Sequence, residues 1–289
     1  MSQPAAQVFF DPLPDNKLVR KRLAALATKF PKHFRGEADA RDYLDRMFVP
    51  RSRRWAFMRN SKTGNSSVIE YLFQLEFGHH VSASFVNPND INEAAAVHRL
   101  IPADVFRQVT YLPGQLDDLT DCLRITTARH PVTRAVSSFR YICRSDELEH
   151  NWFLSDRLRM TALTGFNWSR HRGTPDGFLR FLDYIRISRQ EAGKNAINRH
   201  WRPQRENVLP GLFKPDLIGR LEDLDSFRAD LMNRLGAAGD IPPSIGTFNA
   251  NPGKADEDKM ALLTPEVRRS IEDVYAIDFK WLGYDPDSF

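Results

Sequence analysis

The segment WAFMRNSKTGNSSVIEYLFQLEF, residues 55–77, decides the fold of this chain. Its first four residues, Trp55 to Met58, are apolar and predict a buried β-strand. The second half predicts a buried helix, because its apolar residues recur at helical spacing. These residues are Val68, Ile69, Leu72, Phe73, Leu75 and Phe77. The polar turn between strand and helix carries Lys62, and a helix N-terminus presents unpaired backbone N–H groups to the same point, so the segment predicts an anion site.

The order of residues in this turn distinguishes it from the phosphate loop of NTPases. In the Walker A pattern the lysine follows the second glycine, whereas here Lys62 precedes Gly64. The turn instead resembles the 5′-phosphosulfate loop of sulfotransferases, usually written P-K-T-G-x-[ST]-[ST], which binds 3′-phosphoadenosine 5′-phosphosulfate (PAPS). Ser61 replaces the usual proline, and Asn65 tolerates the left-handed conformation where carbohydrate-directed members often have glycine. The resemblance implies that the 5′-phosphate is held by Lys62, Thr63, Gly64, Asn65, Ser66 and Ser67.

A second strand-to-helix corner is predicted in CLRITTARHPVTRAVSSFRYICR, residues 122–144. Residues 123–128 are rich in β-formers and alternate, and Pro131 favours the first turn of a helix. A helical wheel divides this helix into a buried and an exposed face. The buried face is expected to contain Val132, Val136, Phe139 and Cys143, and the exposed face Arg134, Ser137, Tyr141 and Arg144.

Two polar residues of this corner suit a phosphate monoester. Arg129 ends the predicted strand, and Ser137 lies about two turns into the helix; a guanidinium fork and a hydroxyl group are both phosphate ligands. The pattern R-H-P-x-x-R-x-x-S-x-[FY]-R resembles the 3′-phosphate motif of the same sulfotransferases, including its arginine-to-serine spacing. The resemblance implies that Arg129 and Ser137 hold the 3′-phosphate of PAPS.

Three later segments extend the resemblance. Asn198 to Gln204 contains H-W-x-P-Q, Asp216 to Leu224 contains I-G-x-x-E, and Asp278 to Tyr284 is similar to the ending DF-x-x-(F/L)-GY. These segments resemble the Golgi-type carbohydrate sulfotransferases, the group that includes the chondroitin and HNK-1 enzymes. The resemblance covers about residues 53–284 and implies a carbohydrate or glycolipid acceptor.

Length and composition place the chain among globular proteins. The chain has 289 residues, 42% hydrophobic and 27% charged, as expected for a globular protein with one core or two. The resemblance implies an α/β, P-loop-like sulfotransferase fold whose central, mostly parallel sheet is flanked by helices. The expected domains are an N-terminal helical extension over residues 1–50 and a sulfotransferase domain over residues 51–289.

Further helices are expected outside the two corners. Residues 17–30 show an amphipathic stripe, which favours a helix packed at the core edge over one lying on a membrane surface. A second helix is expected through residues 91–100. A third is expected over residues 226–235, with Asp225 as N-cap and Gly236 as C-cap. Thr264 should start a last helix.

Charge and cysteine content limit the partners. A net charge of +4 suits a polyanionic cofactor and falls short of a nucleic-acid-binding composition. Cys122 and Cys143 have no metal-ligand spacing and are expected to be reduced and buried. The N-terminus lacks an apolar run long enough for a signal peptide or a transmembrane segment, so the sequence predicts a cytoplasmic protein. Golgi relatives carry an N-terminal anchor, which suggests a soluble bacterial relative or a trimmed chain.

Sulfuryl transfer needs charge neutralisation and a base. Lys62 is expected to neutralise the leaving group, and no metal is required. The acceptor hydroxyl needs a base, for which His200 is the first candidate and His98 the second. The turn over residues 249–254 is a weak candidate for contact with the adenine or the 3′-phosphate.

Two other classes of function stay open at this point. An ATP-dependent kinase or nucleotide hydrolase would use the same phosphate loop with magnesium. A non-enzymatic module would bind an anionic polymer through the arginines. The acceptor, the position of sulfation and the oligomeric state are not encoded in any readable motif.

Overall fold

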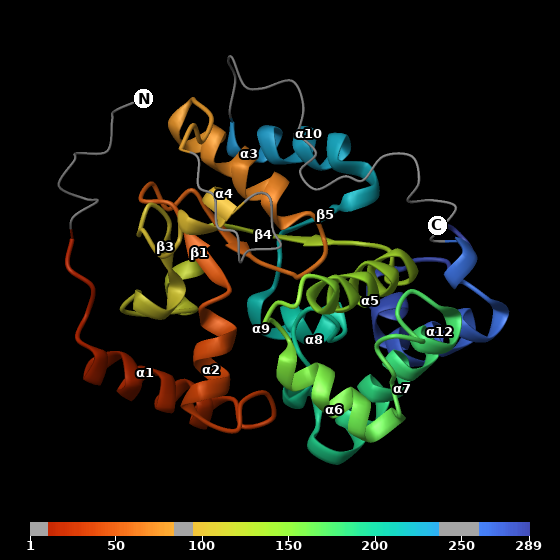
Figure 1. Cartoon of the computed structure of the whole chain (residues 1–289). Helices are drawn as coiled ribbons and strands as arrows, with labels where there is room; N and C mark the ends of the chain where they lie inside the picture. Colours follow the sequence, from red (N-terminus) through yellow and green to blue (C-terminus); the bar gives the residue numbers. More distant parts are fainter. Residues whose placement is uncertain (1–10, 84–94, 237–259) are drawn as a thin grey trace.

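A computed structural model describes residues 11–83, 95–236 and 260–289, and in these ranges the strands form one five-stranded sheet (Figure 1). The strand order across the sheet is β3-β1-β2-β4-β5. The strands are β1 (Met47–Val49), β2 (Trp55–Met58), β3 (Arg107–Gln108), β4 (Leu123–Ala128) and β5 (Leu217–Arg220). The strands predicted from residues 55–58 and 123–128 are confirmed.

The sheet is mixed rather than mostly parallel. β2, β4 and β5 run parallel, with Phe57 opposite Ile125 and Thr126 opposite Ile218. β1 is antiparallel to both β2 and β3. The short connection over residues 50–54 accounts for the antiparallel pair, because parallel neighbours need a long crossover whereas antiparallel neighbours need only a turn.

Each parallel strand is followed by a helix. β2 leads into α3 (Asn65–Phe77), β4 into α5 (Pro131–Glu147), and β5 through the 3₁₀ turn η5 (Leu221–Asp223) into α10 (Leu224–Leu235). The carboxyl ends of parallel strands meet at one edge of a sheet. The three strand-to-helix corners therefore converge at the same edge.

Helices cover both faces of the sheet (Figure 1). On one face, Phe57 and Ile125 pack with Leu72 of α3 and Phe227 of α10. On the other, Ala56 and Met58 pack with the N-terminal helices and the segment after residue 204. The helices of the first face are α3, α4 (Ala95–Arg99) and α10, and those of the second are α1 (Asn16–Lys29), α2 (Glu37–Leu44), α8 (Gln204–Val208) and α9 (Pro210–Phe213).

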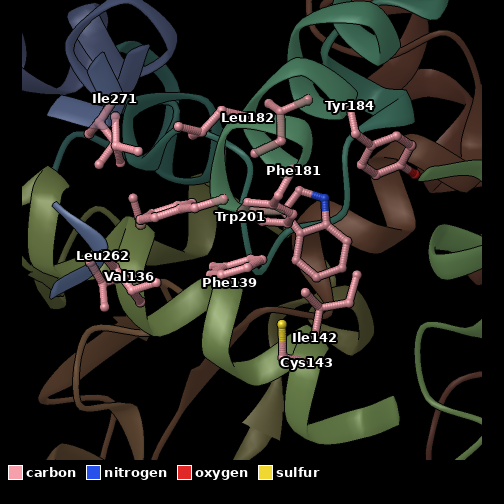
Figure 2. Close-up of a cluster of buried hydrophobic side chains, with 14 of the residues drawn as sticks. Val136, Phe139, Ile142, Cys143, Phe181, Leu182, Tyr184, Trp201, Leu262 and Ile271 are labelled. Carbon is pink, nitrogen blue, oxygen red and sulfur yellow. The ribbon is translucent and has the colours of Figure 1, made fainter. Parts of the chain in front are cut away.

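A further hydrophobic cluster lies beside the sheet and supports α5 (Figure 2). Trp201 is fully buried there, and its ring centroid lies 5.7 Å from that of Phe181. Phe139 of α5 stacks on Phe178 at 4.8 Å. The cluster joins α5 to α6 (Leu154–Thr164), α7 (Pro175–Ala192) and α12 (Pro265–Leu282). Cys143 is in this cluster, and both cysteines are free and buried, as predicted.

The predicted helix boundaries hold with two adjustments. α1 and α12 form where expected, and Thr264 caps α12 by accepting a hydrogen bond from Val267 N. α10 starts earlier than predicted, and its N-cap is Asp223 rather than Asp225, because the Asp223 carboxylate accepts from Ser226 N. Gly236 is the C-cap, as predicted. α4 covers residues 95–99 of the expected helix over 91–100, and residues 91–94 lie outside the described ranges.

The N-terminal part of the chain contributes to the sheet. β1 precedes the predicted boundary at residue 50 and pairs with β2. The division into residues 1–50 and 51–289 stays a prediction. In the described ranges, no helix has both the length and the apolar character required to cross a bilayer.

Gly219 of β5 provides a test of the packing between the sheet and α10. A Cβ atom at this position would lie 2.6 Å from Cγ of Phe227. We expect Gly219→Ala to lower the free energy of unfolding by about 1–3 kcal/mol, because α10 must shift to admit the methyl group. Chemical denaturation measures this loss. Gly211→Ala is the control, because nothing lies within 4 Å of its added Cβ, and an equal loss in both variants would contradict the packing explanation.

Candidate functional site

The phosphate-loop segment adopts a tight left-handed turn. Gly64 is the N-cap of α3 with φ 79°, and Lys62 has φ 70°. Thr63 is fully buried, and its Oγ1 donates to the carbonyl of Asn60 at 2.6 Å and lies 2.6 Å from Oγ1 of Thr127. The loop is therefore anchored to both its own start and the end of β4.

The Asn65 side chain holds the loop closed. Its Nδ2 donates to the Asn60 carbonyl at 2.8 Å, and its Oδ1 accepts from Asn60 N at 3.3 Å. Since this amide is engaged within the loop, the group of Asn65 available to a ligand is its backbone N–H at the start of α3. A side chain at Gly64 would be strained, because φ is 79° and an added Cβ would lie 2.6 Å from Cδ1 of Leu221, which would have to shift.

Lys62 is a largely enclosed cation that forms no ion pair with any carboxylate of the described residues. Its Nζ lies 3.8 Å from the centroid of the Tyr141 ring. Burial, together with the charges of Arg129 and Arg134, lowers its pKa to about 7. An anionic ligand would relieve this cost, because it would favour the charged ammonium.

The structure brings Arg129 and Lys62 into one site. The two side chains are close enough for the Arg129 charge to lower the pKa of Lys62. Nε of Arg129 donates to Oγ1 of Thr133 at 3.0 Å. Ser137 is half-buried on α5, and no contact within the described residues joins it to Arg129. The roles of Arg129 and Ser137 at a 3′-phosphate stay predictions.

Arg134 contradicts the predicted exposed face of α5, because only 1% of it is exposed. Its Nε donates to the carbonyl of Ser61 and one terminal nitrogen to that of Arg202, both at 2.9 Å. The other terminal nitrogen is buried without a partner in the described chain. The helical-wheel prediction was wrong because backbone carbonyls of two irregular segments solvate this guanidinium in place of water. Arg144 is exposed as predicted, and Tyr141 is half-buried.

Gln204 joins the two predicted phosphate corners, a role that the sequence did not reveal. Its side-chain amide pairs with the backbone of Arg129, accepting from N at 3.0 Å and donating to O at 2.7 Å. The same Oε1 accepts from Nδ2 of Asn60 at 3.2 Å. Its own backbone N donates to the buried carboxylate of Asp278 at 2.7 Å. The only signal in the sequence was the H-W-x-P-Q signature itself.

Glu222 of the I-G-x-x-E segment ties the third corner to the second. Its carboxylate accepts from His130 N at 2.7 Å and from the Tyr284 hydroxyl at 2.9 Å. Its charge raises the pKa of Arg129, opposing the larger effect of burial. His130 is engaged as the N-cap of α5, with Nδ1 accepting from Val132 N. Glu222 and His130, which both belong to the predicted motifs, therefore use their side chains in hydrogen bonds within the protein.

His200 has a defined tautomer. Its Nδ1 lies 2.9 Å from Oδ1 of Asn198, and because an amide oxygen only accepts, Nδ1 carries the proton and Nε2 is left as an acceptor. Nδ2 of Asn198 in turn donates to Asp156 at 3.3 Å. Burial lowers the pKa of His200 well below its ordinary value, and the charges of Arg199 and Lys62 lower it further. The imidazole is therefore neutral at pH 7.

The two histidine candidates differ in surroundings. His200 packs on the Tyr141 ring, with 5.4 Å between centroids, and Lys62 lies on the same ring. His98 of α4 instead pairs its Nε2 with Oγ of Ser66 at 3.0 Å, near the start of α3. His200 also lines a cleft of about 460 Å³ that opens between α2, α6 and residues 194–206.

The turn over residues 249–254, a weak candidate for contact with the adenine or the 3′-phosphate, lies outside the described ranges.

Comparisons with known proteins identify the family of the chain. A family model described as "Sulfotransferase family" matches residues 45–285. The chain is also 27% identical over 169 residues to a Xenopus laevis protein named "Carbohydrate sulfotransferase 12". That match covers 54% of this chain and 38% of the relative, so the chain spans well under half of the relative's length. No solved structure gives a significant match to the chain.

Replacing Gln204 by leucine tests the link between the corners. Gln204→Leu leaves the N–H and C=O groups of Arg129 and the Asn60 amide without their buried partner. We expect the free energy of unfolding to fall by about 2–5 kcal/mol, measured by urea denaturation. Gln190→Leu on exposed α7 surface is the matched control and should change stability by less than about 0.5 kcal/mol. A small effect at Gln204 would mean that the corners do not depend on this amide.

Proposed function

Because the chain belongs to the sulfotransferase family, we propose that it transfers a sulfuryl group from PAPS to a hydroxyl group of a carbohydrate or glycolipid acceptor. The observation that carries the proposal is the placement of Lys62 and His200 on one aromatic ring, that of Tyr141. A cation and a neutral base are thereby held side by side, as a transfer between an anionic donor and an alcohol requires. We also propose that the fold is P-loop-like, as the sequence resemblance implies.

The residues of the loop fit a polyanionic nucleotide. Lys62 has no carboxylate partner in the described chain, and Arg129 and Arg134 add positive charge around it. PAPS supplies the sulfuryl group and leaves as the product PAP. The N–H groups at the start of α3 and the hydroxyl groups of Ser66 and Ser67 would hold the 5′-phosphate.

The chain's own groups account for the charge changes of the reaction. Lys62 would stabilise the negative charge that develops on the leaving phosphate oxygen. Arg129 and Ser137 would hold the 3′-phosphate and thus fix the nucleotide's position. Nε2 of His200 would accept the proton of the acceptor hydroxyl, because the tautomer set by Asn198 leaves that nitrogen unprotonated.

Lys62 gives a prediction with a pH signature. Since its pKa is about 7 and a bound phosphate favours the ammonium form, PAP binding above pH 7 must take up a proton. The affinity for PAP should therefore fall as pH rises from 7.5 to 9, by at most about tenfold per pH unit. Lys62→Met should weaken binding and remove this dependence, whereas Lys280→Met on the exposed end of α12 should leave both unchanged. Titration calorimetry across this pH range measures both properties.

Thermal melting in the presence of PAP tests whether PAPS is the donor. PAP at a hundred times its Kd should stabilise the fold by about 2.7 kcal/mol, which thermal melting detects. Absence of any shift at millimolar PAP, or a larger, magnesium-dependent shift with ATP, would contradict the proposal.

Substitutions of the two histidines should have different effects on kcat and on PAP binding. His200→Gln should lower kcat for sulfuryl transfer by roughly 10²–10⁴-fold and leave PAP affinity nearly unchanged, since His200 is proposed to act on the acceptor. His98→Gln should lower kcat far less and weaken PAP binding, because it supports Ser66 in the loop. Transfer of labelled sulfate from PAPS to a panel of oligosaccharides provides the assay. The reverse order of effects would assign the base to His98.

A further inference from the structure

One face of α5 reaches both segments that carry the groups proposed to act in the transfer. Nε of Arg134 donates to the carbonyl of Ser61 in the phosphate loop at 2.9 Å, and Oγ of Ser138 donates to the carbonyl of His200 at 2.7 Å. Tyr141 lies one turn further along the helix. Because residues three and four apart share a face of a helix, these three side chains of α5 form one stripe. The first two hold backbone groups, and the third contacts side chains.

The ring of Tyr141 contacts a cation and an imidazole at once. Nζ of Lys62 lies 3.8 Å from the ring centroid, within the distance of a cation–π contact. The centroid of the His200 ring lies 5.4 Å from the same point. Phe153 and Trp152 pack on the ring at steep interplanar angles of 62° and 73°. The ring is therefore held by neighbours other than the lysine, so its face is already in place for the ammonium.

A neutral ring suits this lysine better than a carboxylate would. A carboxylate would form an ion pair that an incoming phosphate has to break, and it would repel the charge of that phosphate. The face of an aromatic ring attracts an ammonium without carrying a net charge. Within the described ranges, Lys62 forms no ion pair with a carboxylate and lies on this ring. Its charge therefore stays available to an anion.

The ring also restricts the part of Lys62 that the loop leaves free. Hydrogen bonds from Thr63 and Asn65 to the carbonyl of Asn60 hold the backbone of the loop. The lysine side chain itself has a flexible four-carbon stem, which costs entropy to order when a ligand binds. Contact with the Tyr141 ring orders this stem through a group that is fixed on α5.

We propose that Tyr141 is a positioning residue of the donor site, whose ring holds the ammonium of Lys62 by a cation–π contact that persists when the phosphate of the donor binds. This inference rests on the proposed sulfuryl transfer, because Lys62 is assigned there to the leaving group. It adds the residue that keeps this cation in place without neutralising it.

Lys62 is the group of this site whose charge changes near neutral pH. Burial and the charges of Arg129, at the end of β4, and Arg134, on α5, lower its pKa to about 7. His200, on the segment 194–206, has a pKa well below its ordinary value and is neutral at pH 7. The two arginines stay charged throughout. The phosphates of PAP titrate near pH 6 as well, but they do so for every variant, so the affinity relative to wild type reports on Lys62.

Titration of PAP into the full chain at pH 6.0 and pH 8.5 tests the proposal with Tyr141→Leu. At pH 6.0 the lysine of the wild type is charged and contacts the ring in both free and bound protein, so loss of the ring should change the affinity by less than about twofold. At pH 8.5 the free lysine is neutral, and binding must protonate it without the help of the ring. The affinity should therefore be roughly tenfold below wild type, which corresponds to about one unit in the pKa of Lys62.

Two further variants serve as controls. Tyr141→Phe keeps the ring face and should follow the wild type at both pH values. Tyr111→Leu removes a half-buried tyrosine that packs against the N-terminal helices, and it controls for the loss of a phenol side chain elsewhere. Titration calorimetry reports the binding-competent fraction separately from Kd, so a partly unfolded variant does not imitate the expected result.

Several results would overturn the role of Tyr141. Tyr141→Leu with wild-type affinity at pH 8.5 would show that the ring does not assist the lysine, and an equal loss at both pH values would show a purely structural residue. Tighter binding of Tyr141→Leu at pH 6.0 would mean that the ring competes with the phosphate for Lys62. A loss in Tyr141→Phe equal to that in Tyr141→Leu would assign the effect to the hydroxyl group.

Binding of PAP to the wild-type chain separates this inference from the function on which it rests. If PAP binds the wild type and the variants give one of the contrary results, the assignment of Tyr141 alone is overturned. If PAP does not bind the wild type, the proposed sulfuryl transfer is overturned, and the assignment of Tyr141 with it.

Discussion

The hydrogen bonds between the Gln204 side chain and the backbone of Arg129 are the constraint on which the site depends. They join the end of β4 to a segment that is remote in sequence, and through Asn60 they also reach the phosphate loop. Arg134 makes the same connection from α5, from Ser61 to Arg202. The side chains of Gln204, Asn60 and Arg134 are buried, where an unpaired polar atom is costly, so the corners are held in one arrangement. The placement of Lys62 near His200 follows from that arrangement.

The parts of the fold that were predicted correctly are those encoded by local patterns. The apolar run before Lys62 and the proline at the start of α5 determine a strand and a helix start through nearest neighbours alone. The antiparallel β1 was missed, because three residues give too little periodicity to assign a strand.

The parts of the site that were missed depend on contacts between distant segments. The helical wheel placed Arg134 on the exposed face of α5, and nothing within α5 indicates that carbonyls near residues 61 and 202 would surround it. Gln204 and Glu222 were visible as members of motifs, yet their hydrogen-bond partners come from other corners. His200 was selected from the motif that contains Gln204. Its tautomer, which leaves Nε2 able to accept a proton, is set by Asn198, two residues away.

The bracing of the phosphate loop by Asn65 has a consequence for how a nucleotide arrives. The amide of Asn65 and the hydroxyl of Thr63 close the loop on Asn60 through hydrogen bonds within the chain itself. A preorganised loop loses little conformational entropy when an anion binds, so less of the interaction free energy is spent on ordering the protein. Capture of the proposed donor would then be governed by diffusion and electrostatic attraction rather than by refolding of the loop. The slow events of the proposed reaction would fall on the chemical step or on the departure of the spent nucleotide.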